Sequence, residues 1–305
     1  MNKFISPLDQ NFTYGYDSEV FNWRSSDDSK FCCYYQKAQY IPISFREECI
    51  RVCHRISDVA EKLNRIPTIL LSGGLDSEIV VRAFIDSGRR FRIISNRFKD
   101  GLNKHEIENI DKFVKSKNLN VEYVNIDVIK WLDSEQAREF ADLSCCPYSE
   151  MLPTMKLIHN VWFDMSGLPI LGNGDFYAAK NDEGWNYVEF EYIVAWMRYC
   201  VTKEIISAVN FFQLTPEITL SMALDPLIQH TIKSDRHPNL RSTKYLVYKK
   251  HWRDLELRQK FNGAELIQDH CDKVNQTHLS KYKSYTDKWT MPLDDYIKSL
   301  MPHED

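Results

Sequence analysis

Six consecutive residues, Ser72-Gly73-Gly74-Leu75-Asp76-Ser77, combine two hydroxyls, two glycines and a carboxylate. Glycines accept backbone torsions that let main-chain N–H groups approach a ligand closely. Asp76 offers the hard oxygen that Mg²⁺ prefers, and Ser72 and Ser77 offer hydroxyl donors. A helix beginning at Asp76 would point unpaired N–H groups and its positive dipole end at the same place. The stretch therefore predicts a loop that binds the pyrophosphate part of a nucleotide together with Mg²⁺.

Other phosphate-binding patterns are absent from the sequence. Neither G-x-x-x-x-G-K-[S/T] nor G-x-G-x-x-G occurs, so kinase-like transfer of a terminal phosphate and dinucleotide binding are poorly supported. The alternative for the glycine stretch is a strand-to-helix turn that binds nothing. We disfavour that alternative because the complete string is rare by chance in a chain of 305 residues.

Strand and helix patterns alternate around this loop. Ser44 and Glu47 form a capping box at the start of the first helical pattern. Helical spacing of apolar residues covers 44–64, 76–87, 103–117 and 152–165, and short apolar runs predict strands at 68–71, 91–95, 121–124 and 169–171. This alternation predicts an α/β fold, a parallel sheet with helices on both faces. The glycine loop would then lie at the carboxyl edge of the sheet, where ligands of such folds bind.

The remaining chain suggests two parts. Residues 1–42 are rich in aromatic and turn residues and predict a small β-rich extension, whereas 43–305 form the α/β domain. From Tyr187 onward the pattern favours mainly helical structure, and the tail 293–305 predicts a short amphipathic closing helix with a polar end.

Composition narrows the classes of function. The net charge of −4 argues against a partner held mainly through phosphate contacts. No run of about 18 apolar residues and no secretory signal occur, so we expect a cytoplasmic protein without a membrane partner. The eight cysteines form no C-x-x-C pair, and Cys49 and Cys53, four residues apart, are expected to face a core as free thiols.

The string from Ser72 to Ser77 resembles the signature of the N-type ATP pyrophosphatases, the PP-loop superfamily. Over about residues 44–270 the chain is similar to the synthetase domain of asparagine synthetases, through LLSGGLDS and the segments 172–175, 224–227 and 258–261. The resemblance implies an adenine nucleotide alpha-hydrolase-like fold. It also implies that ATP is attacked at its α-phosphate, commonly by a carboxylate, with pyrophosphate leaving and AMP displaced in a second step.

The resemblance also assigns roles to individual residues. Asp76 and Asp175 would hold Mg²⁺ on the pyrophosphate, and Lys260 would stabilise the charge that develops on the phosphate. The phosphates would be bound by Ser72, Gly73, Gly74, Leu75, Asp76 and Ser77, and the adenine would be lined by Leu70, Ile94 and Gly172.

Two departures from the family pattern limit what can be carried over. Asn2 stands where a glutaminase would need its cysteine, so nitrogen would come from ammonia, an amine substrate or a separate amidotransferase. Asn173 replaces the glutamate of the family's second loop, which puts aspartate as substrate in doubt. Glu189 or Glu191 could supply a carboxylate for acid–base work. We favour the interpretation that both are surface residues.

The leading hypothesis is an ATP-dependent, AMP-forming carbon–nitrogen ligase. It would adenylate a small carboxylate and transfer the product to ammonia or an amine. One alternative is an enzyme that modifies nucleic acids or nucleobases, with the basic stretch 233–288 as the docking face. Another is a catalytically idle nucleotide-binding module. Replacing Asp76 with asparagine is expected to remove most turnover with little loss of stability.

Overall fold

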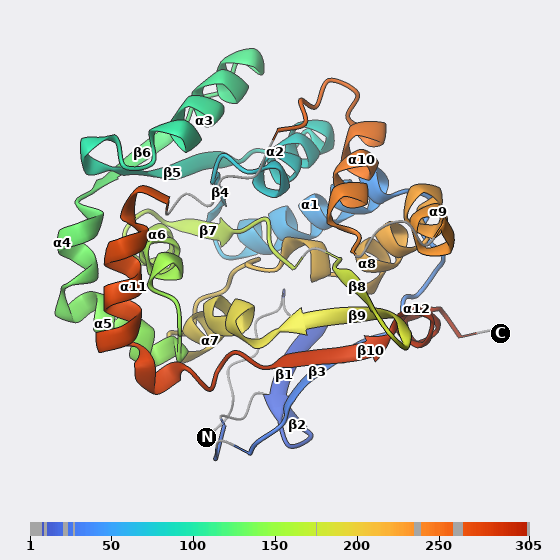
Figure 1. Ribbon diagram of the computed structural model, residues 1–305. Helices are drawn as coiled ribbons and strands as arrows, with labels where there is room; N and C mark the ends of the chain where they lie inside the picture. The colour runs from blue at the N-terminus through green and yellow to red at the C-terminus, as the bar shows by residue number, and fades with distance from the viewer. Residues whose placement is uncertain are drawn as a thin grey trace.

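A four-stranded parallel sheet lies at the centre of the molecule (Figure 1). The computed structural model describes residues 8, 11–20, 24–26, 28–174, 176–234, 239–258 and 265–303. The strand order is β6-β5-β4-β7, with β4 at Ile66–Leu70, β5 at Arg92–Phe98, β6 at Glu122–Ile126 and β7 at Gly167–Ile170. The expectation of an α/β fold with a parallel sheet is confirmed.

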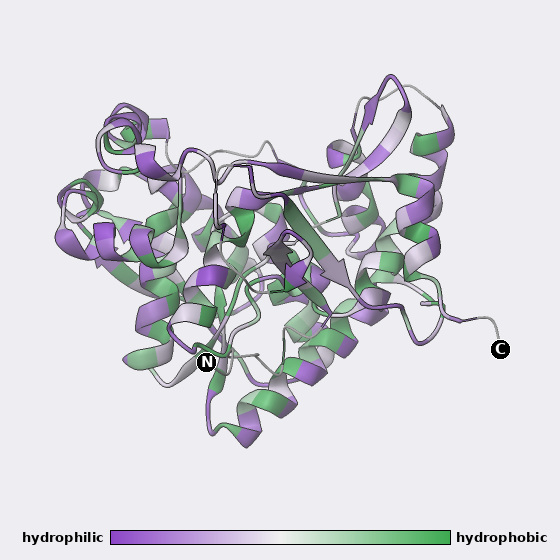
Figure 2. Ribbon diagram, turned by 90° about the horizontal axis from the view of Figure 1, so that it is seen from below, coloured by the Kyte–Doolittle hydropathy of each residue, from purple (hydrophilic) through white to green (hydrophobic). Residues whose placement is uncertain are grey.

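Hydrophobic cores lie on both faces of the sheet, and β4 and β7 are almost entirely buried, which explains their apolar sequences. Side chains alternate between two hydrophobic cores: Ile69 and Ile93 enter one, and Leu70 and Ile94 enter the other. The first core is completed by α1 (Phe45–Lys62), α2 (Leu75–Ser87), α3 (Lys104–Ser116), α8 (Pro216–Ala223) and α10 (Arg241–His251). The second is completed by α4 (Val128–Leu132), α5 (Glu135–Ser144), α6 (Leu152–Phe163), α7 (Ala195–Thr202) and α11 (Gln268–Thr277). Figure 2 shows hydrophobic and hydrophilic residues alternating along these helices, as expected where one side faces a core.

Helix α1 has the start and the buried face that its sequence predicts. The Ser44 hydroxyl accepts a hydrogen bond from the Glu47 N–H at 3.3 Å, which satisfies one free donor of the first turn. Cys49 and Cys53 are fully buried, and all eight cysteines are free thiols.

Two small antiparallel sheets lie next to each other beside the central one (Figure 1). The first contains β1 (Phe12–Tyr16), β2 (Glu19–Val20) and β3 (Phe31–Tyr35) in the order β2-β1-β3. The second contains β8 (Ala178–Asn181), β9 (Gly184–Phe190) and β10 (Lys288–Pro292) in the order β10-β9-β8. The prediction of mainly helical structure beyond Tyr187 overlooked β10, because that strand pairs with residues about a hundred positions earlier. The predicted closing helix is present as α12 (Leu293–Leu300).

The short elements complete the chain. Helix α9 covers Pro226–Ser234, and single 3₁₀ turns occur at Lys99–Gly101, Ser149–Met151, Glu191–Val194, Phe211–Gln213, Glu265–Ile267 and Ser280–Tyr282. Within the described parts of the chain, no helix is long and apolar enough to span a bilayer.

Glu191 anchors the N-terminal sheet to the rest of the protein. Its side chain is fully buried, accepts a hydrogen bond from the Tyr16 hydroxyl and forms an ion pair with Arg198 at 3.2 Å. Arg24 approaches the second carboxylate oxygen at 3.0 Å. Burial raises the pKa of Tyr16 well above its usual range, so the phenol keeps its proton and donates it. The interpretation of Glu189 and Glu191 as surface residues was wrong, since only 6% of Glu189 is exposed.

Candidate functional site

The predicted glycine loop connects β4 to α2. Gly74 is the N-cap of α2 and has no side chain with which to cap the first N–H groups of the helix. Those groups therefore lack intrahelical partners and, with the helix dipole, favour an anion. Gly73 has a φ of +75°, a conformation that favours glycine. The local geometry is that of a tight strand-to-helix turn that leaves the first N–H groups of α2 without a side-chain cap.

The two serines of the turn have different surroundings. Ser77 is 2% exposed; its hydroxyl donates to the Gly74 carbonyl at 3.1 Å and accepts from the Ser72 N–H at 3.1 Å. Ser72 is exposed, and its hydroxyl lies 3.0 Å from that of Ser77. Ser77 therefore fixes the shape of the turn, whereas Ser72 is open to solvent.

We expect Gly73→Ala to deform the turn. A β-carbon at Gly73 would lie 2.8 Å from the backbone oxygen of Glu106, and its positive φ adds strain of about 1–3 kcal/mol. Nucleotide affinity should fall by about tenfold or more. Gly88→Ala is the matched control, because Gly88 has a φ of +66° with nothing within 4 Å of the added carbon. Titration of both variants with MgATP checks the prediction, and equal affinities would contradict it.

A second loop, after β7, reaches the same place. Strands β5 and β7 lie on opposite sides of β4, so the order of the parallel strands reverses there, where open α/β sheets bind ligands. A β-carbon on Gly172 would lie 2.9 Å from the backbone oxygen of Asp76, so this loop packs against the start of α2. Asp175 and Lys260 lie outside the described residues, and their assigned roles stay predictions.

Asp76 is held by two side chains of α10. Lys244 Nζ lies 3.0 Å from Asp76 Oδ1, and the Tyr248 hydroxyl donates to the same oxygen at 2.9 Å. The Lys244 side chain is only 3% exposed, so this member of the basic stretch 233–288 does not face solvent. Lys244 and Tyr248 are four positions apart and share one helix face, a signal that the sequence already contained.

Arg258 also contacts the turn. Its guanidinium donates to the Gly73 carbonyl at 2.9 Å and pairs with the buried carboxylate of Glu78 at 2.7 Å. Glu78 also pairs with Arg82 at 2.8 Å. These contacts tie the turn to α2 and to the chain after α10, so its geometry is set before a ligand binds.

A cavity of about 280 Å³ opens from the turn toward α6. Ser72, Gly74 and Leu70, three of the residues that the resemblance assigns to the nucleotide, line this cavity. Ile94 is fully buried and does not line the cavity; the next two residues, Ser95 and Asn96, do. The other lining residues are Leu71, Phe98, Asn103, Glu106, Glu150, Pro153, Thr154, Leu157, Leu171, Trp196 and Ile267.

Glu106 brings a titratable carboxyl into this cavity. It lies in the first turn of α3, with its backbone against Gly73. Burial raises the pKa of Glu106 to about 7, a hydrogen bond from Asn103 opposes the increase and the carboxylate of Glu265 adds to it. Sequence reasoning missed Glu106, because nothing in its local pattern indicates that α3 begins beside the turn.

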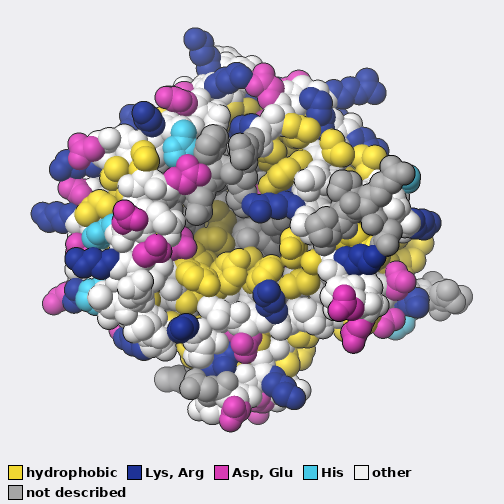
Figure 3. Space-filling view, viewed as in Figure 1, with side chains coloured by type: hydrophobic (Ala, Val, Ile, Leu, Met, Phe, Trp, Pro, Cys, Tyr) yellow, Lys and Arg dark blue, Asp and Glu magenta, His cyan; other side chains and the backbone are white. Residues whose placement is uncertain are grey.

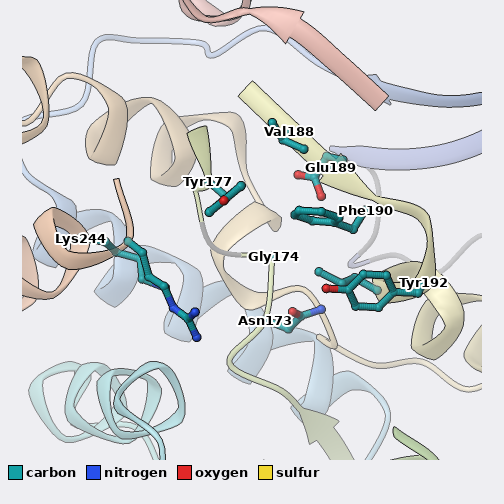
Figure 4. A pocket seen from close by; sticks show the side chains of 10 residues that line it. Asn173, Gly174, Tyr177, Val188, Glu189, Phe190, Tyr192 and Lys244 are labelled. Carbon is teal, nitrogen blue, oxygen red and sulfur yellow. The ribbon is translucent and has the colours of Figure 1, made fainter. Parts of the chain in front are cut away.

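A second cavity, of about 240 Å³, lies on the other side of Lys244 (Figure 4). Lys244 faces it from α10, Glu189 and Phe190 from β9, and Asn173 and Gly174 from the loop after β7. The space-filling view in Figure 3 shows this face of the molecule hollowed near its centre, with hydrophobic side chains along the hollow. Lys244 thus contacts Asp76 at the turn and also lines the second cavity.

These features define an α/β protein with a charged site at the carboxyl edge of its parallel sheet. Comparison with known protein families and with curated proteins finds no match to this sequence. Among the described residues, no group of three or more His, Cys, Asp or Glu side chains is arranged to hold a metal ion.

Proposed function

We propose that the protein is an AMP-forming ligase of the PP-loop type, with an adenine nucleotide alpha-hydrolase-like fold. It adenylates a carboxylate with ATP, releases pyrophosphate and passes the acyl group to ammonia or an amine. The observation that carries the proposal is the position of Lys244. This buried cation contacts Asp76 at the start of α2 and also lines the second cavity. A cation placed between a phosphate site and an acceptor site suits attack at the α-phosphate.

The turn would hold the leaving group. The β- and γ-phosphates of ATP would bind at the N-terminus of α2, whose first N–H groups have no side-chain cap. Arg258 keeps the turn in shape through the Gly73 carbonyl. The carboxylate of Asp76 suits Mg²⁺, and with Asp175 it would hold an ion that neutralises charge on the departing pyrophosphate.

The second cavity would hold the acceptor, which is the carboxylate that is adenylated. Glu189 lies on its β9 wall, and the Glu189 carboxylate accepts hydrogen bonds from Tyr187 and Gln213, which fix its position. We assign Glu189 to accept a proton from the attacking amine, since Asn173 cannot do so. Glu191 is excluded from this role because it is sequestered with Tyr16 and Arg198.

The nucleic-acid alternative is less well supported. Lys244 points inward, and Lys250 pairs with Asp225 at 2.7 Å, so the basic stretch presents less free charge than its sequence suggests. Weak dependence of substrate binding on salt would count against this alternative.

The nucleotide products test the proposal. The protein is incubated with ATP, Mg²⁺, ammonia and a mixture of small carboxylates, and the products are separated. AMP with pyrophosphate is expected. ADP with phosphate would overturn the proposed reaction, and binding of ATP without any turnover would favour the idle module.

ATP affinity should depend on pH through Glu106. Below a pH of about 7 this carboxyl is neutral, and above it the carboxylate repels the phosphates. Affinity should therefore fall as the pH rises from 6 toward 9, by at most about tenfold per unit. Among the described residues, the charged groups near Glu106 include Glu265, Glu150 across the cavity and Arg258 at the turn.

Glu106→Gln should abolish this part of the pH dependence. Calorimetric titrations of wild type and variant at several pH values are compared as a ratio, which cancels the titration of ATP itself. Glu108→Gln is the control, because Glu108 is exposed on the same helix. Affinity that rises with pH and loses this rise in Glu106→Gln would show instead that the carboxylate binds Mg²⁺.

A further inference from the structure

Three aromatic rings form one wall of the second cavity. The ring centroids of Tyr177 and Phe190 lie 5.6 Å apart, and those of Phe190 and Tyr192 also lie 5.6 Å apart. All three side chains are half-buried and line the cavity, as Figure 4 shows. The wall is therefore a continuous aromatic surface turned toward a ligand.

Charge is divided between opposite sides of this cavity. Arg241 and Lys244 line it from α10, whereas Glu189 lies on the β9 side beside the aromatic wall. A carboxylate on the ligand would be attracted to the α10 side, and the aromatic wall would then contact the part of the ligand that points away.

We propose that the acceptor is a carboxylate with an aromatic ring or a similarly flat apolar body, and that it is not aspartate. The inference rests on the proposed function, because it assigns this cavity to the substrate that is adenylated. Aspartate has no apolar surface to pack against the three rings. Its second carboxylate would also lie near the carboxylate of Glu189. The ring of an aromatic acid would pack against the aromatic wall. The carboxylate of the same acid would then point toward Lys244 and the turn.

Binding is tested first with 3-phenylpropionate and with aspartate, measured by ligand-observed NMR on the full chain. We expect 3-phenylpropionate to bind and Phe190→Ala to weaken it by about tenfold. Phe190→Leu, which keeps an apolar side chain, guards against loss of folding and should weaken binding less. Phe163→Ala is the matched control, since Phe163 is 51% exposed on α6 and does not line the cavity. Binding of aspartate alone, or equal binding by wild type and Phe190→Ala, would overturn the inference.

Turnover separates this inference from the proposed function. Pyrophosphate exchange into ATP is measured with each acid in turn. Exchange that depends on 3-phenylpropionate supports both proposals. Exchange with aspartate but not with 3-phenylpropionate keeps the ligase and overturns the aromatic acceptor. Binding that depends on Phe190, with ADP and phosphate as the only products, keeps the aromatic site and overturns the ligase. Exchange that requires an oligonucleotide overturns the small-molecule acceptor.

Discussion

Asp76→Asn should lower ATP turnover by about 10²–10³-fold, because it removes a charge from the point where the turn, α2 and α10 meet. It should also destabilise the fold by about 1–3 kcal/mol, since Lys244 is buried and loses its ionic partner. The sequence alone suggested little loss of stability. The structure changes that expectation, because the Asp76 carboxylate is the ionic partner of Lys244, which is only 3% exposed. Asp76 therefore contributes to stability as well as to the proposed metal site.

Urea unfolding and steady-state turnover measure the two effects separately. The double variant Asp76→Asn/Lys244→Met should recover stability without recovering activity, because it removes the unpaired buried charge. Asp86→Asn is the control, since Asp86 lies near the end of the same helix and pairs with Arg46 at 2.9 Å, away from the turn. Full activity of Asp76→Asn would refute the role of this carboxylate.

The second large effect is expected from Lys244→Met. Losing this cation should lower kcat by about 10²–10³-fold while changing KM for ATP less, because its charge matters most when the phosphate charge develops. Folding should be affected little, since Asp76 keeps the Tyr248 hydroxyl at 2.9 Å and is itself 14% exposed.

Lys250→Met is the matched control for Lys244→Met. Lys250 lies on the same helix, is 43% exposed and pairs with Asp225 at 2.7 Å. Asp225 is only 4% exposed but keeps the hydrogen bond from the Leu227 N–H at 2.9 Å, so the variant should lose some stability but retain turnover. Equal losses in the two variants would mean that α10 acts through its overall charge, and a fall confined to KM would mean that Lys244 only binds ATP.

Local chemistry was sufficient to predict the scaffold of this protein. Apolar spacing predicted α1 and the four parallel strands, and the capping pair of Ser44 and Glu47 placed a helix start correctly. The glycine turn was recognisable because a strand, two glycines and a helix start are consecutive in the chain. Hydrophobic periodicity, helix caps and turn residues act over a few neighbouring positions, so they can be recognised from the sequence alone.

The surroundings of the turn were decided only by tertiary structure. The ion pair between Lys244 and Asp76, the approach of Glu106 to Gly73 and the burial of Glu191 all join segments far apart in the chain. Beside their own neighbours in the sequence, Lys244, Glu106 and Glu191 looked like ordinary surface residues. Whether such a charge is solvated, paired or raised in pKa depends on what packs against it, and that is set by long-range contacts between elements. The sequence therefore determined where a phosphate could bind, and the fold determined which charges meet it.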